Sequence, residues 1–252
     1  ISSSVSIVGA NNQDTILDGN DYDTVIEVMG SVAVTLERIE IRNGSQAEID
    51  AGRGGGLYVN TPSTVTLRHV IVRQNTAPSG GGIYSKGALI LESSKVIGDH
   101  ARTGGGIISA GGTLRLTDST VRNNSANVSG ATGGGVIIVN GSAWIIRSRI
   151  VDNDALAYDG GIYISGAEVV IRASTISGNN SNIGGGIAAE GSASPEFVAL
   201  LTTTISGNEA RGWGGGVSSV SIPLRIQNST ITANSMTGTG TLGEGGGMYV
   251  GA

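Results

Sequence analysis

The chain has 252 residues, of which 43 are glycine, one is phenylalanine and none is cysteine. These counts exclude a disulfide framework, a thiolate metal site and a core dominated by aromatic side chains. The formal net charge is −5, and the two lysines, Lys86 and Lys95, form no basic cluster of the kind that nucleic-acid binding requires. No run approaches the roughly 18 consecutive apolar residues of a membrane span. We therefore expect neither nucleic-acid binding nor membrane insertion by this segment.

The chain opens on Ile1, and a strand-like alternation follows from Val5 to Val8. It stops at Ala252, just after a new repeat has begun. We interpret residues 1–252 as a single repeat domain that is a fragment or a processed part of a longer chain.

A run of glycines followed by an aliphatic residue recurs along the whole chain. The aliphatic members of this repeat are Leu57, Ile83, Ile107, Val136, Ile162, Ile187, Val217 and Met248. Their spacing of 24 to 31 residues is the period of a solenoid whose loops tolerate insertions. Glycine is expected at the corners, where the backbone adopts positive φ or approaches a neighbouring coil closely.

A second block follows within each period and has the form aliphatic-x-aliphatic, four residues, aliphatic-x-x-Asn. Leu114, Leu116, Val121 and Asn124 show it clearly. Alternation with a period of two indicates strands and not helices. The sequence therefore predicts an all-β right-handed parallel β-helix of about eight to nine coils of 24–31 residues, with almost no α-helix.

The residue that ends this block is polar and recurs in the same place of each coil. We interpret it as a structural ladder, because a carboxamide both donates and accepts hydrogen bonds. The predicted ladder consists of Asn75, Asp99, Asn124, Asn153, Asn179, Asn208 and Asn234.

Large apolar residues also occupy positions that alternation places outside the coil. They are Tyr58, Tyr84, Ile108, Ile137 and Tyr163 after the glycine runs, and Trp144 on the following strand. An exposed apolar stripe marks an interaction surface. We expect these residues to contact another surface protein or a glycan.

The acidic residues of the repeat raise the questions of hydrolysis and of calcium binding. A polysaccharide hydrolase needs paired carboxylates, and Glu92 and Asp118 form a diagonal pair that is better explained as exposed surface charge. Calcium is conceivable in the loops of Asp18 to Asp23 and of Asp152 to Asp159, but neither matches a known calcium-loop spacing. We therefore predict no catalytic residue, no metal site and no cofactor.

The segments Gly80 to Tyr84 and Asn228 to Asn234 carry a family resemblance. They resemble β-helix repeats of large bacterial surface proteins and are similar to repeats of the chlamydial polymorphic outer-membrane proteins. The resemblance implies an extracellular or cell-surface location and a non-catalytic structural or adhesive role. Independently of it, neither end of the sequence shows a helix cap or a polar closing repeat, and open ends of this kind favour end-to-end self-association. A pectate-lyase-like lyase, a glycoside hydrolase and a glycan-binding module are the alternatives.

Overall fold

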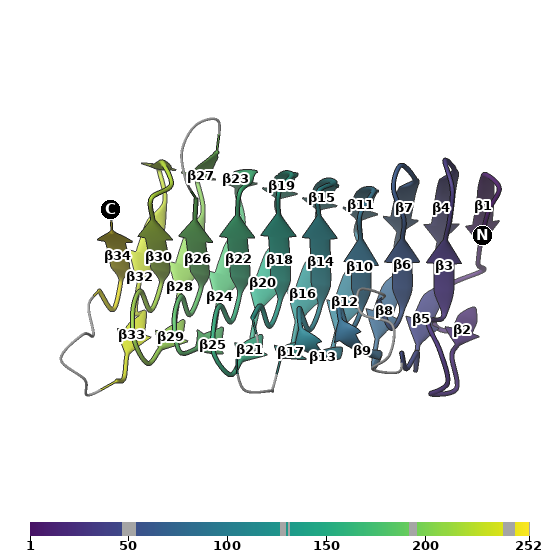
Figure 1. The fold of residues 1–252 in the computed structure, drawn as a ribbon, viewed down its shortest axis with the longest axis horizontal. Helices are drawn as coiled ribbons and strands as arrows, with labels where there is room; N and C mark the ends of the chain where they lie inside the picture. Colours follow the sequence, from purple (N-terminus) through teal and green to yellow (C-terminus); the bar gives the residue numbers. More distant parts are fainter. Residues whose placement is uncertain (47–53, 127–129, 131, 192–195, 239–244, 252) are drawn as a thin grey trace.

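The computed structural model describes residues 1–46, 54–126, 130, 132–191, 196–238 and 245–251. Within them the chain forms 34 short strands and no helix, so the predicted all-β class is confirmed. The strands stack coil upon coil into a rod, with the two chain termini at opposite ends (Figure 1). No helix of the described residues is long and apolar enough to cross a membrane.

The coils build three parallel sheets of nine strands each, which we name sheets A, B and C. Sheet A contains β1 (Val5–Val8), β4 (Ala33–Glu37), β7 (Thr64–Arg68), β11 (Ala88–Glu92), β15 (Thr113–Thr117), β19 (Ser142–Ile146), β23 (Glu168–Arg172), β27 (Phe197–Leu201) and β31 (Leu224–Gln227). Sheet B contains β2 (Ile16–Asp18), β5 (Glu40–Arg42), β8 (Ile71–Arg73), β12 (Lys95–Ile97), β16 (Thr120–Arg122), β20 (Arg149–Val151), β24 (Thr175–Ser177), β28 (Thr204–Ser206) and β32 (Thr230–Thr232). Sheet C contains β3 (Ile26–Val28), β6 (Leu57–Val59), β10 (Ile83–Ser85), β14 (Ile107–Ala110), β18 (Val136–Val139), β22 (Ile162–Ser165), β26 (Ile187–Glu190), β30 (Val217–Val220) and β34 (Met248–Gly251).

A fourth sheet, sheet D, has seven shorter strands in the described part of the chain. Its strands are β9 (Thr76–Ser79), β13 (His100–Thr103), β17 (Ser125–Ala126), β21 (Asp154–Ala155), β25 (Asn180–Ser181), β29 (Glu209–Ala210) and β33 (Ser235–Met236). A complete coil runs from sheet C through A and B to D, and every strand pairs in parallel with its equivalent in the next coil.

The core consists of columns of aliphatic side chains that register aligns along the rod. In sheet B, for example, Val96 pairs with Val72 and Val121, and Ile150 pairs with Val121 and Ile176. These side chains are almost completely inaccessible to solvent. Each buried aliphatic contributes roughly 1.5–3 kcal/mol, and the like-on-like columns therefore fix the pairing register of every coil.

Close approach of the backbone explains the middle glycine of the runs. At Gly105, a Cβ atom would lie 2.6 Å from the backbone nitrogen and oxygen of Ser125 and 2.7 Å from the carbonyl oxygen of Gly134. Real Cβ atoms do not approach backbone atoms this closely, so a side chain here requires the corner to move.

The predicted asparagine ladder forms one column at the corner between sheets B and D, buried from Asn75 to Asn208 and partly buried at Asn234. Asn124 Nδ2 donates to Asn153 Oδ1 at 3.0 Å, and the Asn124 backbone N–H donates to the same oxygen. The Asn124 amide also donates to the carbonyl oxygen of Val96 in the preceding coil. Each asparagine thereby ties three coils together, and the same pattern repeats at Asn153 and Asn179.

A second ladder of hydroxyl groups occupies the corner between sheets A and B. The backbone N–H of Ser94 donates to Ser119 Oγ, that of Ser119 to Ser148 Oγ, and that of Ser148 to Ser174 Oγ, each at 3.1 Å. All four serines are buried. Both corners therefore satisfy their buried backbone donors with side chains of the next coil.

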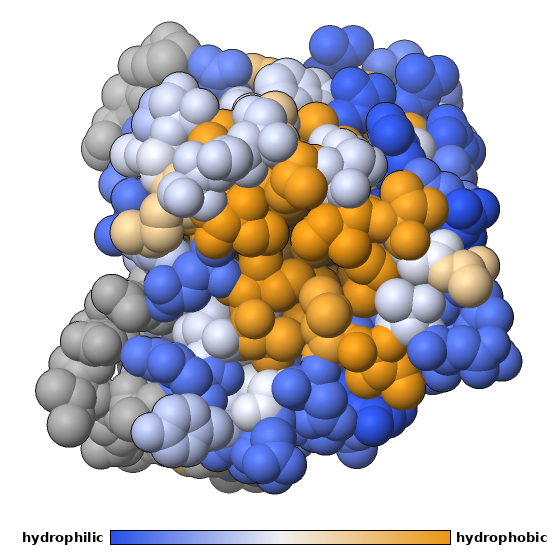
Figure 2. Space-filling model, turned by 90° about the vertical axis from the view of Figure 1, so that its right-hand side faces the viewer, coloured by the Kyte–Doolittle hydropathy of each residue, from blue (hydrophilic) through white to orange (hydrophobic). Residues whose placement is uncertain are grey.

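The two end faces of the rod expose the ends of the apolar columns. At the first coil Val5, which continues the column of Val34, is exposed, and at the last coil the exposed side chains include Ile226, Met248 and Val250. Val8 and Ile16 are also exposed at the first coil, but they pair with Glu37 and Glu40 and lie outside the columns. Figure 2 shows the apolar side chains gathered at the centre of the end that carries β1, with hydrophilic residues around them.

Candidate functional site

The structure aligns the predicted apolar stripe on one face of sheet C. Tyr58 pairs with Tyr84, Tyr84 with Ile108, Ile108 with Ile137, and Ile137 with Tyr163. Trp144 does not belong to this column. It lies on β19 of sheet A, between Arg115 and Val170 in register, and is 40% exposed.

The expectation that this whole column is exposed is wrong. Tyr58, Ile108 and Ile137 are only 7%, 5% and 3% exposed, whereas Tyr84 and Tyr163 are half-buried. The corner between sheets D and C packs on the column from outside, so that a Cβ atom on Gly104 would lie 2.3 Å from Ile108 Cγ1. Most of the stripe is therefore internal packing, and a ligand can reach only its partly exposed tyrosines.

The two tyrosines at the N-terminal end of the stripe form a small aromatic cluster. The ring centroids of Tyr58 and Tyr84 are 6.1 Å apart. The Nζ atom of Lys86 lies 5.9 Å from the first centroid and 5.8 Å from the second. Cation–π attraction to both rings therefore holds this ammonium group next to the last residues of β6 and β10 in sheet C.

Tyr163 has two acidic neighbours, Glu190 and Asp159. Its hydroxyl donates a hydrogen bond to Glu190, and burial together with this hydrogen bond raises the pKa of Tyr163. Asp159 is buried nearby with φ of 62°, at a position that is glycine in most of the other coils. Burial, with a smaller contribution from Glu190, raises the pKa of Asp159 well above its usual value.

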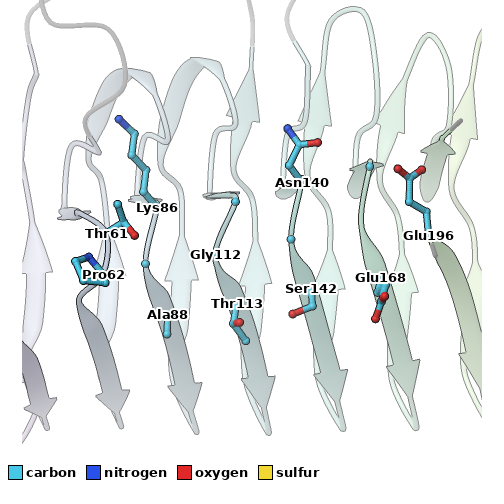
Figure 3. Close-up of a pocket in the computed structure, with 14 residues that line it drawn as sticks. Thr61, Pro62, Lys86, Ala88, Gly112, Thr113, Asn140, Ser142, Glu168 and Glu196 are labelled. Atoms are coloured by element: carbon cyan, nitrogen blue, oxygen red, sulfur yellow. The ribbon is translucent and has the colours of Figure 1, made fainter. Parts of the chain in front are cut away.

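A groove runs along the corner where sheet C passes into sheet A. It has a volume of about 700 Å³ and crosses successive coils from Thr61 to Glu196 (Figure 3). The remaining lining residues are Pro62, Lys86, Gly87, Ala88, Gly111, Gly112, Thr113, Asn140, Gly141, Ser142, Gly166 and Glu168. A second hollow of about 400 Å³ shares Asn140, Gly166 and Glu196 with it and adds Glu190. We call these two hollows together the corner groove.

The shape of the corner groove follows from its glycines. A Cβ atom on Gly112 would lie 2.0 Å from the carbonyl oxygen of Gly87, and one on Gly141 would lie 2.2 Å from that of Gly112. A side chain is thus excluded at the last position of three consecutive turns, Gly87, Gly112 and Gly141. The walls are formed instead by the first residues of the sheet A strands, among them Thr113 and Ser142, which pair in register.

The carboxylates considered for catalysis are each paired with an arginine. Glu92 accepts a hydrogen bond from Arg68 Nε at 2.8 Å, and Asp118 accepts two from Arg147 at 2.8 Å. The hydrogen bonds from Arg147 lower the pKa of Asp118. Exposed pairs of this kind contribute little to stability. These two carboxylates therefore behave as solvated surface charges.

The first loop considered for calcium is also occupied by protein donors. Asp18 accepts hydrogen bonds from Arg42 Nε at 2.8 Å, from Asn43 Nδ2 and from the backbone of Asn20. The hydrogen bond from Arg42 is the main cause of the lowered pKa of Asp18. The Arg42 guanidinium thus occupies the Asp18 carboxylate, and within the described part of the chain Asp18, Asp21 and Asp23 do not form a group that could hold a metal ion.

The second loop does not gather its acidic residues either. Asp154 accepts a hydrogen bond from Asn180 Nδ2 at 2.7 Å, whereas Asp159 is buried against sheet C. Among the described residues, no three His, Cys, Asp or Glu side chains lie close enough to hold a metal ion.

Sequence reasoning missed the corner groove. It followed strand positions and found no acidic cluster, whereas Glu168, Glu190 and Glu196 lie at strand ends and in turns. The signal that could have found it is the recurrence of glycine at 87, 112 and 141, directly before the sheet A strands, with Gly166 one residue earlier in the next coil.

The fold and this site define a parallel β-solenoid that carries an open polar groove along one corner. No family model, no curated protein and no solved structure matches the chain.

Proposed function

We propose that this chain is a structural and adhesive segment of a bacterial extracellular or cell-surface protein, and that it holds an extended glycan in the corner groove. The observation that supports this proposal is the groove itself, which continues across successive coils parallel to the rod. The resemblance of the repeats to those of chlamydial polymorphic outer-membrane proteins supports the surface location. A net charge of −5 disfavours a nucleic-acid partner.

The chemistry of the groove suits sugars. Thr61, Thr113 and Ser142 offer hydroxyl groups, and Asn140 offers a carboxamide, so both donors and acceptors face the opening. The glycine positions leave room for a sugar ring to approach the backbone. Because coils repeat every ~4.8 Å, a polymer with a similar repeat meets the corresponding positions of successive coils, whose side chains differ.

Blocking the groove tests the proposal. Thr113 and Arg115 both point outward from β15, but only Thr113 lines the groove. A glycan array should give binding by the wild type and by Arg115→Trp, and loss of binding by Thr113→Trp. Equal binding by all three proteins would contradict a glycan site in this groove.

A polysaccharide-active enzyme is the second candidate, and one observation favours it. Glu168 and Glu196 both line the groove, and paired carboxylates are what glycoside hydrolysis needs. Release of reducing ends from a bound polysaccharide would support this candidate, provided that Glu168→Gln abolishes the release. Binding without any release favours the adhesive function.

End-to-end association of two copies is the proposed role of the end faces. The inward columns of sheet A end on Ile226 of β31 at one face and begin on Ile7 of β1 at the other, and both strands run in the same direction. A second copy can therefore continue the sheets head to tail. Light scattering over a concentration series should show longer particles at high concentration. Val5→Lys on the end face should prevent them, and Leu156→Lys, at an exposed position in the middle of the rod, should not.

A further inference from the structure

The tripeptide Asn-Gly-Ser occurs twice in the chain, and the structure holds its two copies differently. The first begins at Asn43, directly after β5 of sheet B, and the second begins at Asn140, between β18 of sheet C and β19 of sheet A. We propose that Asn140 is a site of spontaneous deamidation in the folded protein and that Asn43 is protected from this reaction. The inference is independent of what the corner groove binds.

Deamidation begins at the backbone nitrogen of the residue that follows an asparagine. This nitrogen loses its proton and attacks Cγ of the asparagine, so that a new N–C bond closes a succinimide ring and the side-chain nitrogen leaves as ammonia. Water then opens the ring at either carbonyl, and aspartate or isoaspartate replaces asparagine. Glycine is the most favourable following residue, because it has no side chain to hinder the attack and its backbone turns freely. The reaction therefore requires a backbone N–H that is not engaged in a hydrogen bond.

Asn140 meets this requirement. Its side chain is exposed, and Figure 3 shows it in the turn that leads to Ser142. Its φ of 53° lies in the left-handed region, which asparagine tolerates better than most residues. The N–H groups of Asn140 and Ser142 donate to the carbonyl oxygens of Ser165 and Gly112, whereas the N–H of Gly141 has no acceptor among the described residues. The nitrogen that would attack is thus the free one in this turn.

Asn43 has the same neighbours in sequence but is held by the asparagine ladder. The Gly44 N–H donates to Asn75 Oδ1 at 2.9 Å, and Gly44 is buried. The Asn43 carboxamide donates to both carboxylate oxygens of Asp18. Ring closure at Asn43 would break the buried hydrogen bond to Asn75, and this cost slows the reaction by at least about tenfold.

Deamidation of Asn140 would change the corner groove. Asn140 lines both of its hollows, so a modified molecule gains a carboxylate at the place that they share. Isoaspartate would in addition lengthen the backbone of the turn before β19 by a methylene group. The charge of the groove would therefore depend on the age of the molecule.

Peptide mapping by mass spectrometry, after incubation in isotopically labelled water at mildly alkaline pH, tests the inference. The folded protein should take up label at Asn140 at least about tenfold faster than at Asn43. A second sample is kept in enough denaturant to unfold it, as judged by circular dichroism. There the two positions should react at similar rates, because they share one tripeptide and the ladder is gone. Asn140→Gln should remove the fast reaction of the folded protein, because glutamine closes its larger ring much more slowly.

Three results would overturn the inference. The first is equal rates at the two positions of the folded protein, and the second is a faster reaction at Asn43. The third is an Asn140 that stays intact in the folded protein while both positions react in the unfolded one, since the turn would then exclude the ring. None of these results bears on glycan binding, which Thr113→Trp tests separately.

Discussion

Asp99 takes the place of asparagine in one coil of the ladder, and its replacement by asparagine gives a quantitative prediction. Asp99 Oδ1 accepts hydrogen bonds from the backbone and the side chain of Asn75, both at 2.8 Å. Its Oδ2 is buried and has no partner among the described residues. By analogy with Asn124, this position faces the carbonyl oxygen of Val72 and the Oδ1 of Asn124, which are both acceptors. An ionised carboxylate is therefore unfavourable there.

The size of the effect follows from the pKa. Burial raises the pKa of Asp99 from 3.8 to about 7. Because the folded pKa is the higher one, the folded state retains the proton more strongly, and the contribution of Asp99 to stability is greatest below pH ~4 and is lost as the pH rises towards ~7. One pKa unit corresponds to about 1.4 kcal/mol, so this loss amounts to about 4 kcal/mol.

Asp99→Asn should remove this dependence and restore the missing donor. We expect the variant to be more stable than the wild type by about 1 kcal/mol near pH 4, where one additional hydrogen bond is gained. The advantage should grow to about 5 kcal/mol above pH ~7.5. Urea unfolding at a series of pH values measures both free energies. Asp159 is common to the two proteins, so its own titration cancels in the difference.

Two results would refute this reasoning. A difference in unfolding free energy that stays constant between pH ~4 and pH ~7.5 would mean that Asp99 ionises normally. A less stable Asp99→Asn would mean that Oδ2 has a specific partner that asparagine cannot replace.

Three further substitutions probe the ladder and the corners by thermal melts. Asn153→Ala should destabilise the rod by about 3 kcal/mol or more, because it leaves buried partners of both neighbouring coils unpaired; a change below about 1 kcal/mol would contradict the ladder. Asp159→Gly should raise the melting temperature, most strongly at neutral pH, because glycine removes both the buried carboxylate and the strain of positive φ. A lower melting temperature would instead mean that the Asp159 side chain stabilises the fold. Gly134→Ala should lower the melting temperature, because its Cβ atom would lie 2.5 Å from the carbonyl oxygen of Asp154. Gly247→Ala should be neutral, because its Cβ atom would meet nothing within 4 Å. Similar melting temperatures of the two variants would show that the backbone of the corner can move.

The sequence by itself determined the architecture of this protein. Alternating aliphatic residues define strands, and their return after every 24 to 31 residues defines a stack of coils in which like residues meet. The ladder position of Asn124 and the inward position of Val121 followed from the same repeat, because a parallel solenoid converts sequence spacing directly into spatial columns. In such a structure, residues at the same place in the repeat also lie next to one another in space.

Only the tertiary structure decided what is accessible and what is brought together. Alternation placed Ile108 and Ile137 outside the coil, but the corner between sheets D and C folds over them and buries them. Glu168 and Glu196 are 28 residues apart and belong to no shared column, yet they line one groove. The burial of the isoleucines and the meeting of the glutamates depend on the paths of the corners and inserted turns. Those paths follow from backbone packing between coils, and the period-two pattern that identifies strands in the sequence does not predict them.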